Sequence, residues 1–79
     1  VSKIAEIEFG FTENSNVELN IYNLLGKKVI TLVNKDMTSG VHKIKFNCSD
    51  LEQGIYQYKI VILSTNENFV RTKKMIISH

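Results

Sequence analysis

Apolar and polar residues alternate with a period of two along most of this 79-residue chain. The alternation runs through AEIEFGF and resumes in VELNIYN after the polar connection TENSN. No window keeps the i, i+3, i+4, i+7 apolar spacing of an amphipathic helix. Because successive side chains of a strand point to opposite faces, the pattern indicates strands that each bury one face. The residues predicted to face inward from the first two strands are Ala5, Ile7, Phe9, Phe11, Val17, Leu19 and Ile21.

Four further segments read as strands, namely VITLV, HKIKFN, IYQYKIVIL and FVRTKKMII. Gly26 in LLGKK marks a tight connection, NKDMTSG is predicted to be a loop, and STNEN is predicted to be a hairpin turn. SDLEQG is too short for more than one helical turn. Strands spaced roughly 8–12 residues apart and joined by short polar turns favour an antiparallel sandwich. We therefore predict a single all-β domain over residues 1–79, an Ig-like sandwich of six to seven strands.

Length and charge exclude several classes of protein. A chain of this size buries only about 60–65% of the surface that it exposes when unfolded. Ten Lys and Arg residues against eight Asp and Glu residues are too balanced for a nucleic-acid-binding protein. The longest apolar run, Ile60 to Leu63, is far shorter than the ~20 residues of a membrane-spanning helix. The chain begins with Val1 rather than Met, so we expect it to be part of a longer protein.

The histidines and the cysteine do not predict a catalytic or metal site. Cys48 has no second cysteine to pair with, and His42 and His79 are the only histidines in the sequence. His42 shares the phase of Ile44 and Phe46, which predicts a half-buried side chain bound to a backbone group rather than a general base. Cys48 has the same phase and is predicted to be a small core residue. We expect no metal and no cofactor.

Carboxylates and tyrosines also have simple structural interpretations. Glu6 and Glu8 share one face of a strand, but catalysis by a carboxylate pair needs a cleft, so they are predicted to be solvated. Tyr56 and Tyr58 are in phase with the core, with their hydroxyls reaching a rim. Tyr22 is out of phase and is the better candidate for a surface residue, which keeps a carbohydrate-binding accessory module open. The sequence predicts no catalytic residue and no enzyme.

The final stretch, RTKKMIISH, combines cations with an apolar strand. Arg71 and Lys73 share the register of Met75, whereas Lys74 has the opposite register, so cations are predicted on both faces of one strand. Met75 and Ile77 are predicted to be core residues. Two interpretations remain open: lysines on an edge strand guard against aggregation, or they select an acidic partner that adds a strand to the edge.

Several motifs, taken in order, resemble a known family. They are the strand IEFGF, the hairpin IYNLLGKKV, the segment from Ser39 to His42, the block LEQGIYQYKI and the closing Lys73-Lys74-Met75. From Ile7 to Ile77 the chain resembles the C-terminal sorting domain of type IX secretion, type A. It is also similar to the related Ig-like domain of the flagellar hook-capping protein.

The resemblance implies a non-catalytic signal that directs a larger cargo protein through the periplasm and the outer-membrane translocon, for release or for attachment to the cell surface. The implied partners are translocon components and the upstream cargo domain of the same chain. A structural Ig-like assembly module remains a further alternative. The residues implied in recognition are Arg71, Lys73, Lys74, Met75, Ile76 and Ile77. The residues implied in shaping the fold are Gly26, Gly40, Gly54 and Tyr56.

Overall fold

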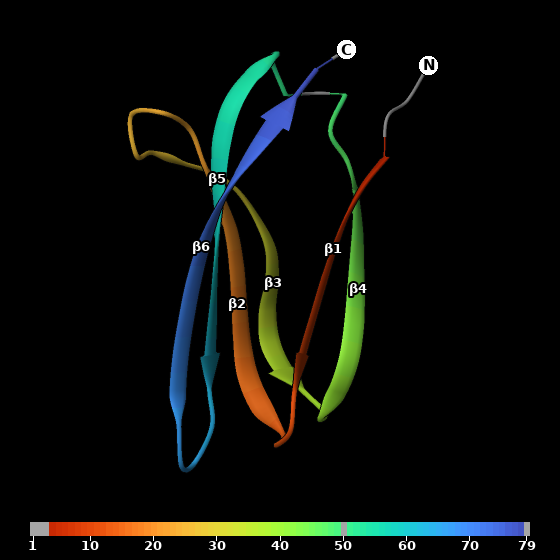
Figure 1. Ribbon diagram of the computed structural model, residues 1–79, viewed down its shortest axis with the longest axis vertical. Coiled ribbons are helices and arrows are strands. Elements are labelled where there is room, and N and C mark those ends of the chain that lie inside the picture. Colours follow the sequence, from red (N-terminus) through yellow and green to blue (C-terminus); the bar gives the residue numbers. More distant parts are fainter. Residues whose placement is uncertain (1–3, 50, 79) are drawn as a thin grey trace.

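The computed structural model describes residues 4–49 and 51–78, which form two antiparallel sheets packed together (Figure 1). This part of the chain contains six strands and no helix, so it has no helix able to cross a membrane, and the predicted all-β sandwich is confirmed. The strands are β1 (Ile4–Phe11), β2 (Ser15–Tyr22), β3 (Lys28–Met37), β4 (Gly40–Asn47), β5 (Gly54–Leu63) and β6 (Asn68–Ile77).

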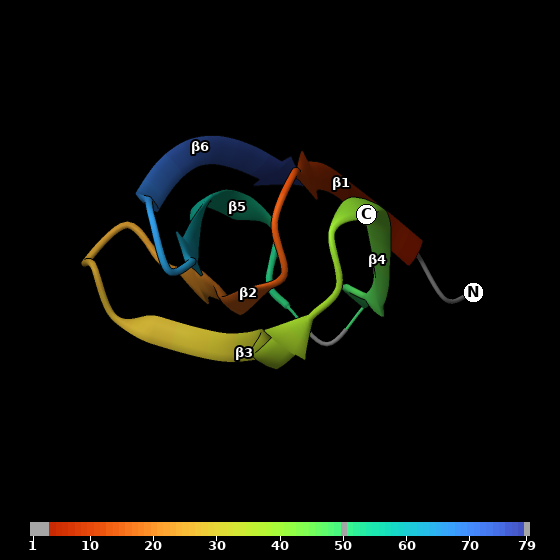
Figure 2. The ribbon, with the colours of Figure 1, turned by 90° about the horizontal axis from the view of Figure 1, so that it is seen from below.

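The two sheets differ in size. One sheet contains only β1 and β4, and the other has the strand order β3-β2-β5-β6. The final strand is therefore an edge strand, paired with β5 from Gly54 opposite Ile77 to Leu63 opposite Asn68. Viewed along the sandwich, β6 and β1 line the same side of the molecule, although they belong to different sheets (Figure 2).

The core lies between the sheets and follows the alternation of the sequence. Val17, Leu19 and Ile21 on the central strand β2 are fully buried. They are joined by Ile60 from β5 and by Ile7 from the two-stranded sheet. Burying such a side chain contributes roughly 1.5–3 kcal/mol relative to leaving it in water. Because the chain is small, these few residues supply much of its stability.

Strand β3 departs from the predicted boundaries. Asn34 was expected to begin a loop, but the strand continues to Met37 and pairs with β2. The prediction was wrong because residues 34–36 are exposed on this edge strand, so no apolar alternation marks them. The pairing of β2 with β3 also shifts register twice, between Leu19 and Asn20 and between Ile21 and Tyr22. Such irregularities twist an edge strand away from regular pairing.

His42 and Cys48 have the structural roles that the sequence predicted. The half-buried His42 ring lies near the rings of Phe9 and Phe11, and its Nε2 donates a hydrogen bond to the carbonyl oxygen of Thr38 at 2.7 Å. Cys48 is buried in the core. Within residues 4–49 and 51–78, no group of three or more His, Cys, Asp and Glu side chains is arranged to hold a metal ion.

Candidate functional site at the free edge of β6

The two faces of β6 carry different side chains. Lys73 lies opposite Tyr58 and Arg71 lies opposite Ile60, so both cations have the register of the face that packs on the core. Lys74 lies opposite Gln57 on the other face. The predicted distribution of cations over both faces of the strand is therefore confirmed.

Burial changes along the inner face of β6. At the C-terminal end Ile77 is buried and Met75 is half-buried against the core, as predicted. Arg71 and Lys73, in the same register, are exposed, and Phe69 is 44% exposed. The core therefore covers the inner face of β6 only at its C-terminal end.

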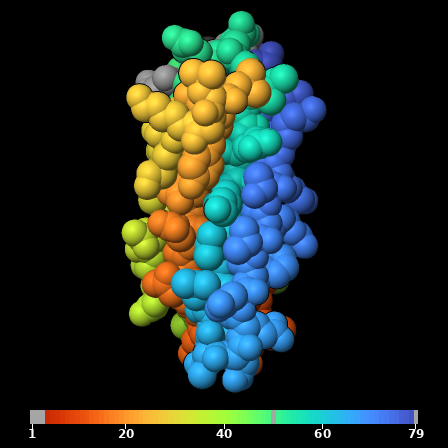
Figure 3. All heavy atoms as spheres, turned by 90° about the vertical axis from the view of Figure 1, so that its left-hand side faces the viewer, coloured from red at the N-terminus to blue at the C-terminus, as the bar shows by residue number. Residues whose placement is uncertain are grey.

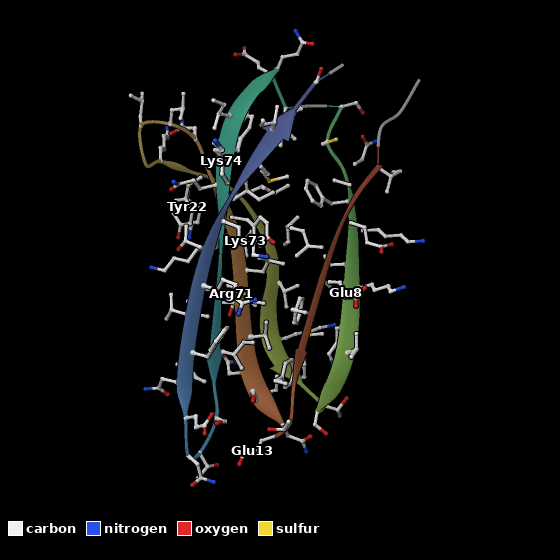
Figure 4. All side chains as sticks on the ribbon, in the orientation of Figure 1. Glu8, Glu13, Tyr22, Arg71, Lys73 and Lys74 are labelled. Carbon is white, nitrogen blue, oxygen red and sulfur yellow. The ribbon has the colours of Figure 1, made fainter. Side chains whose placement is uncertain are left out.

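A groove lies beside this uncovered part. β1 contributes Ile7 and Phe9 to it, β5 contributes Ile60, and β6 contributes Arg71 and Lys73. A second hollow adjoins the first and continues past Phe11, at the end of β1. Ile62 and Phe69 border both hollows. We call these two hollows together the edge groove. Figure 4 shows Arg71 and Lys73 on β6 and Glu8 on β1.

The charges along the edge groove are unevenly distributed. The Arg71 guanidinium lies 5.2 Å from the centre of the Phe69 ring, a cation–π distance that holds the cation over an apolar side chain. Within the described part of the chain, neither Arg71 nor Lys73 forms an ion pair. Glu8 borders the groove beside these cations, whereas Glu13 borders its other end. Two exposed cations, Arg71 and Lys73, thus line the β6 side of the groove.

On the outer face of β6, Lys74 and Ile76 are both exposed. Ile76 lies opposite Ile55 on β5, so an apolar pair precedes the end of the strand. All six residues that the resemblance implicates thus lie on one edge strand. Four of them have the inner-face register, two have the outer-face register, and only Ile77 is buried.

The four residues implied in shaping the fold occupy turns and strand ends. Gly26 lies in the β2–β3 turn with φ of 81°, while Gly40 and Gly54 begin β4 and β5 with φ of 125° and 154°. The Tyr56 ring is buried, and its hydroxyl donates a hydrogen bond to the carbonyl oxygen of Glu52 at 2.8 Å.

The three tyrosines do not form a common platform. Tyr56 and Tyr58 are on the core side of β5, while Tyr22 is half-buried on the opposite face of the sheet. Glu6 and Glu8 are exposed as predicted, and Glu6 lies 4.0 Å from Lys45. The geometry therefore favours neither a stacked sugar site nor a carboxylate pair in a cleft.

The sequence reasoning missed the edge groove and the place of Phe69 in it. Phe69 was assigned only to a strand, yet it borders both hollows and supports Arg71. Its register with Arg71 and Lys73 was a usable signal, because three residues spaced by two share one face of a strand. The position of β1 across the groove has no comparable local signal.

One family of proteins matches almost the whole chain. Residues 1–78 match the family described as "Secretion system C-terminal sorting domain". The chain belongs to this family. It is a sorting signal for type IX secretion, which takes the protein that carries it through the periplasm to the cell surface or out of the cell. No curated protein and no solved structure matches the chain.

Proposed function

We propose that the free edge of β6 is the part of the sorting domain that the outer-membrane translocon recognises, by adding a strand of its own to this edge. The order β3-β2-β5-β6 leaves two edges on the larger sheet. Pairing of β6 with β5 is regular over the whole strand, whereas the other edge strand, β3, shifts register twice. A regular edge supports strand addition better, because its unpaired N–H and C=O groups keep the spacing of a ladder.

The cations of β6 give this edge its selectivity. Arg71 and Lys73 project from one face and Lys74 from the other, and all three are exposed. A strand added beside β6 places its side chains next to those of β6 on both faces. We infer that the translocon strand carries acidic residues, because complementary charges speed encounter and disfavour wrong partners. The observation that carries the proposal is this exposed set of cations on a regular edge.

We further infer that residues 1–79 act as one non-catalytic unit attached to an upstream cargo domain. The family description, a sorting domain, supports a binding role. Two residue types that often act in catalysis have structural roles here. His42 is held by the Thr38 carbonyl oxygen, and Cys48 is buried in the core.

Export of a reporter tests the proposal. The chain is fused to the C-terminus of a fluorescent protein that carries a periplasmic targeting signal, in a cell with type IX secretion. Reversing both inner cations, with Arg71→Glu and Lys73→Glu, is expected to abolish appearance of the reporter outside the cell. Both residues are exposed, so the thermal unfolding midpoint of the purified domain should change little.

Lys35→Glu is the matched control. Lys35 is an exposed cation on β3, opposite Val17, so it has the inner-face register on the other edge of the same sheet. Export of this variant should equal that of the unchanged domain. Normal export of the Arg71→Glu, Lys73→Glu variant, or equal loss with Lys35→Glu, contradicts recognition at the β6 edge.

A further inference from the structure

A rigid turn between β2 and β3 exposes two leucines. The Asn23 side-chain oxygen accepts hydrogen bonds from the backbone N–H groups of Leu25 and Lys27, at 2.9 and 3.0 Å. The Asn23 carbonyl oxygen accepts a third from Gly26, and the Asn23 N–H donates a fourth to the Lys27 carbonyl oxygen. Four hydrogen bonds thus fix a turn of five residues. Within it, Leu24 is 73% exposed and Leu25 is 92% exposed.

These leucines belong to a larger apolar surface. Leu24 and Leu25 border a shallow hollow together with Ile55, which is 40% exposed. Ile55 lies opposite Ile76 on the neighbouring strand, and Ile76 is 67% exposed. In Figure 3 the β2–β3 turn, the start of β5 and the end of β6 lie together at the top of this face. We call these four residues the tip patch.

A row of lysines and a tyrosine borders the tip patch. The pairing registers place Lys28, Tyr22, Gln57 and Lys74 side by side across the four strands, on the outer face of the sheet. Lys59 lies two residues further along β5 on the same face. A tyrosine and lysines around an apolar tip are typical of protein surfaces that sit at the boundary between lipid and water.

Charge on this face changes sign along the strands. The rows nearest the tip patch hold Lys28, Lys59 and Lys74, whereas Glu18 and Asp36 lie on the same face further from it. Among the described residues, the hollow beside the patch has one carboxylate on its wall, that of Glu52. The cationic half of the face therefore coincides with its apolar end, and the carboxylates of its strands lie in the other half.

We propose that the tip patch is a docking surface for an anionic lipid bilayer. Leu24 and Leu25 enter the boundary between headgroups and acyl chains, and the lysines contact the headgroup phosphates. Charge complementarity favours a bilayer as the partner, because apolar side chains bordered on one side by rows of lysines match an anionic bilayer, whose surface attracts lysines near it. The β2–β3 turn projects from the sheet (Figure 1), which suits entry of its leucines into a deformable bilayer. The proposal shares Lys74 and Ile76 of β6 with the proposed function. It rests on Leu24 and Leu25, which lie in the β2–β3 turn, so the two proposals can fail separately.

Vesicle sedimentation tests this with the 79-residue chain. Vesicles of phosphatidylcholine are compared with vesicles of phosphatidylcholine and phosphatidylglycerol at low salt. The chain should partition about tenfold or more in favour of the anionic vesicles, given several lysines near the surface. Replacing both leucines, with Leu24→Ser and Leu25→Ser, should lower binding to anionic vesicles by about tenfold, because the buried apolar area is lost. Asn23 and Gly26 stay in place, so the turn is retained.

Three further variants sharpen the test. Val41→Ser changes another exposed apolar residue, 70% exposed on β4, and should bind as the unchanged chain does. Lys27→Glu with Lys28→Glu should remove the preference for anionic vesicles. Leu25→Trp introduces a tryptophan into a chain that has none, so its fluorescence should shift to shorter wavelength on binding.

Three outcomes overturn the proposal. They are no binding to anionic vesicles, equal binding to both kinds of vesicle, and unchanged binding after both leucines are replaced. A tip patch that contacts only another protein gives the first of these.

Discussion

The Tyr56 hydroxyl donates a hydrogen bond to the carbonyl oxygen of Glu52 at 2.8 Å, while the tyrosine ring is buried in the core. One side chain thus joins the connection between β4 and β5 to the start of β5. Gly54 lies between the two residues and has φ of 154°, a backbone conformation that side chains rarely adopt. The hydrogen bond and the glycine conformation therefore both fix this connection, next to β5, the strand that pairs with β6.

Removing the hydroxyl with Tyr56→Phe should lower the free energy of unfolding by about 1 kcal/mol, the typical net contribution of one hydrogen bond. The ring stays in place, so no cavity forms. Urea denaturation followed by circular dichroism measures the change. Tyr58→Phe is the control, because Tyr58 is half-buried on the same side of β5. An equal loss in both variants contradicts a specific role for the bond to Glu52.

Leucine-to-alanine substitutions should separate the core from the tip patch. Leu19 is fully buried, so Leu19→Ala should cost about 2–5 kcal/mol through lost burial and the cavity left behind. In a small domain that loss is comparable to the whole free energy of unfolding, so much of the variant should be unfolded. Leu25→Ala should change stability by less than about 0.5 kcal/mol, because the side chain is 92% exposed. Thermal unfolding of both variants measures the difference.

The turn glycine offers a purely conformational test. Gly26 has φ of 81°, and a Cβ added there meets no atom within 4 Å. Gly26→Ala should therefore destabilise the domain by roughly 1–2 kcal/mol through backbone strain alone. Gly26→Asn should cost less, because asparagine adopts positive φ more readily than other residues with a side chain. Equal losses on urea denaturation would show that the turn relaxes to another conformation.

Alternation in the sequence predicted the buried faces of the strands, because apolar residues recur every second position in a strand that has one buried and one solvent-exposed face. Val17, Leu19 and Ile21 were all placed correctly in the core. The same signal failed at Asn34, where β3 continues although its side chains are exposed. The hydrophobic pattern predicts which residues are buried. It does not predict a stretch of strand whose side chains are exposed and which only backbone hydrogen bonds hold in the sheet.

The arrangement of strands was harder to predict than their existence. Nothing local in IAEIEFGF indicates that it pairs with GVHKIKFN rather than with the final strand. The edge groove exists because of that choice, so it could not be predicted from either segment. The exposure of the tip-patch leucines could not be predicted either, because the sequence of apolar residues beside a glycine turn is the same whether they pack on the core or face solvent.

Arg71 and Lys73 should also keep the free edge of β6 from pairing with a second copy. Inward-pointing charges on an edge strand oppose edge-to-edge association, because a second sheet would have to bury them without partners. Replacing both with isoleucine would give β6 the uninterrupted inner face Phe69-Ile-Ile-Met75-Ile77. We expect this Arg71→Ile, Lys73→Ile variant to dimerise or aggregate at micromolar concentration.

Sedimentation velocity over a range of concentrations measures this association. Lys35→Ile is the matched control, because the edge strand β3 that carries Lys35 pairs irregularly with β2. It should stay monomeric at the same concentrations. If the Arg71→Ile, Lys73→Ile variant also stays monomeric, the cations do not guard the edge. A partner that contacts them would then remain as the reason for two exposed cations on this inner face, since neither forms an ion pair within the described part of the chain.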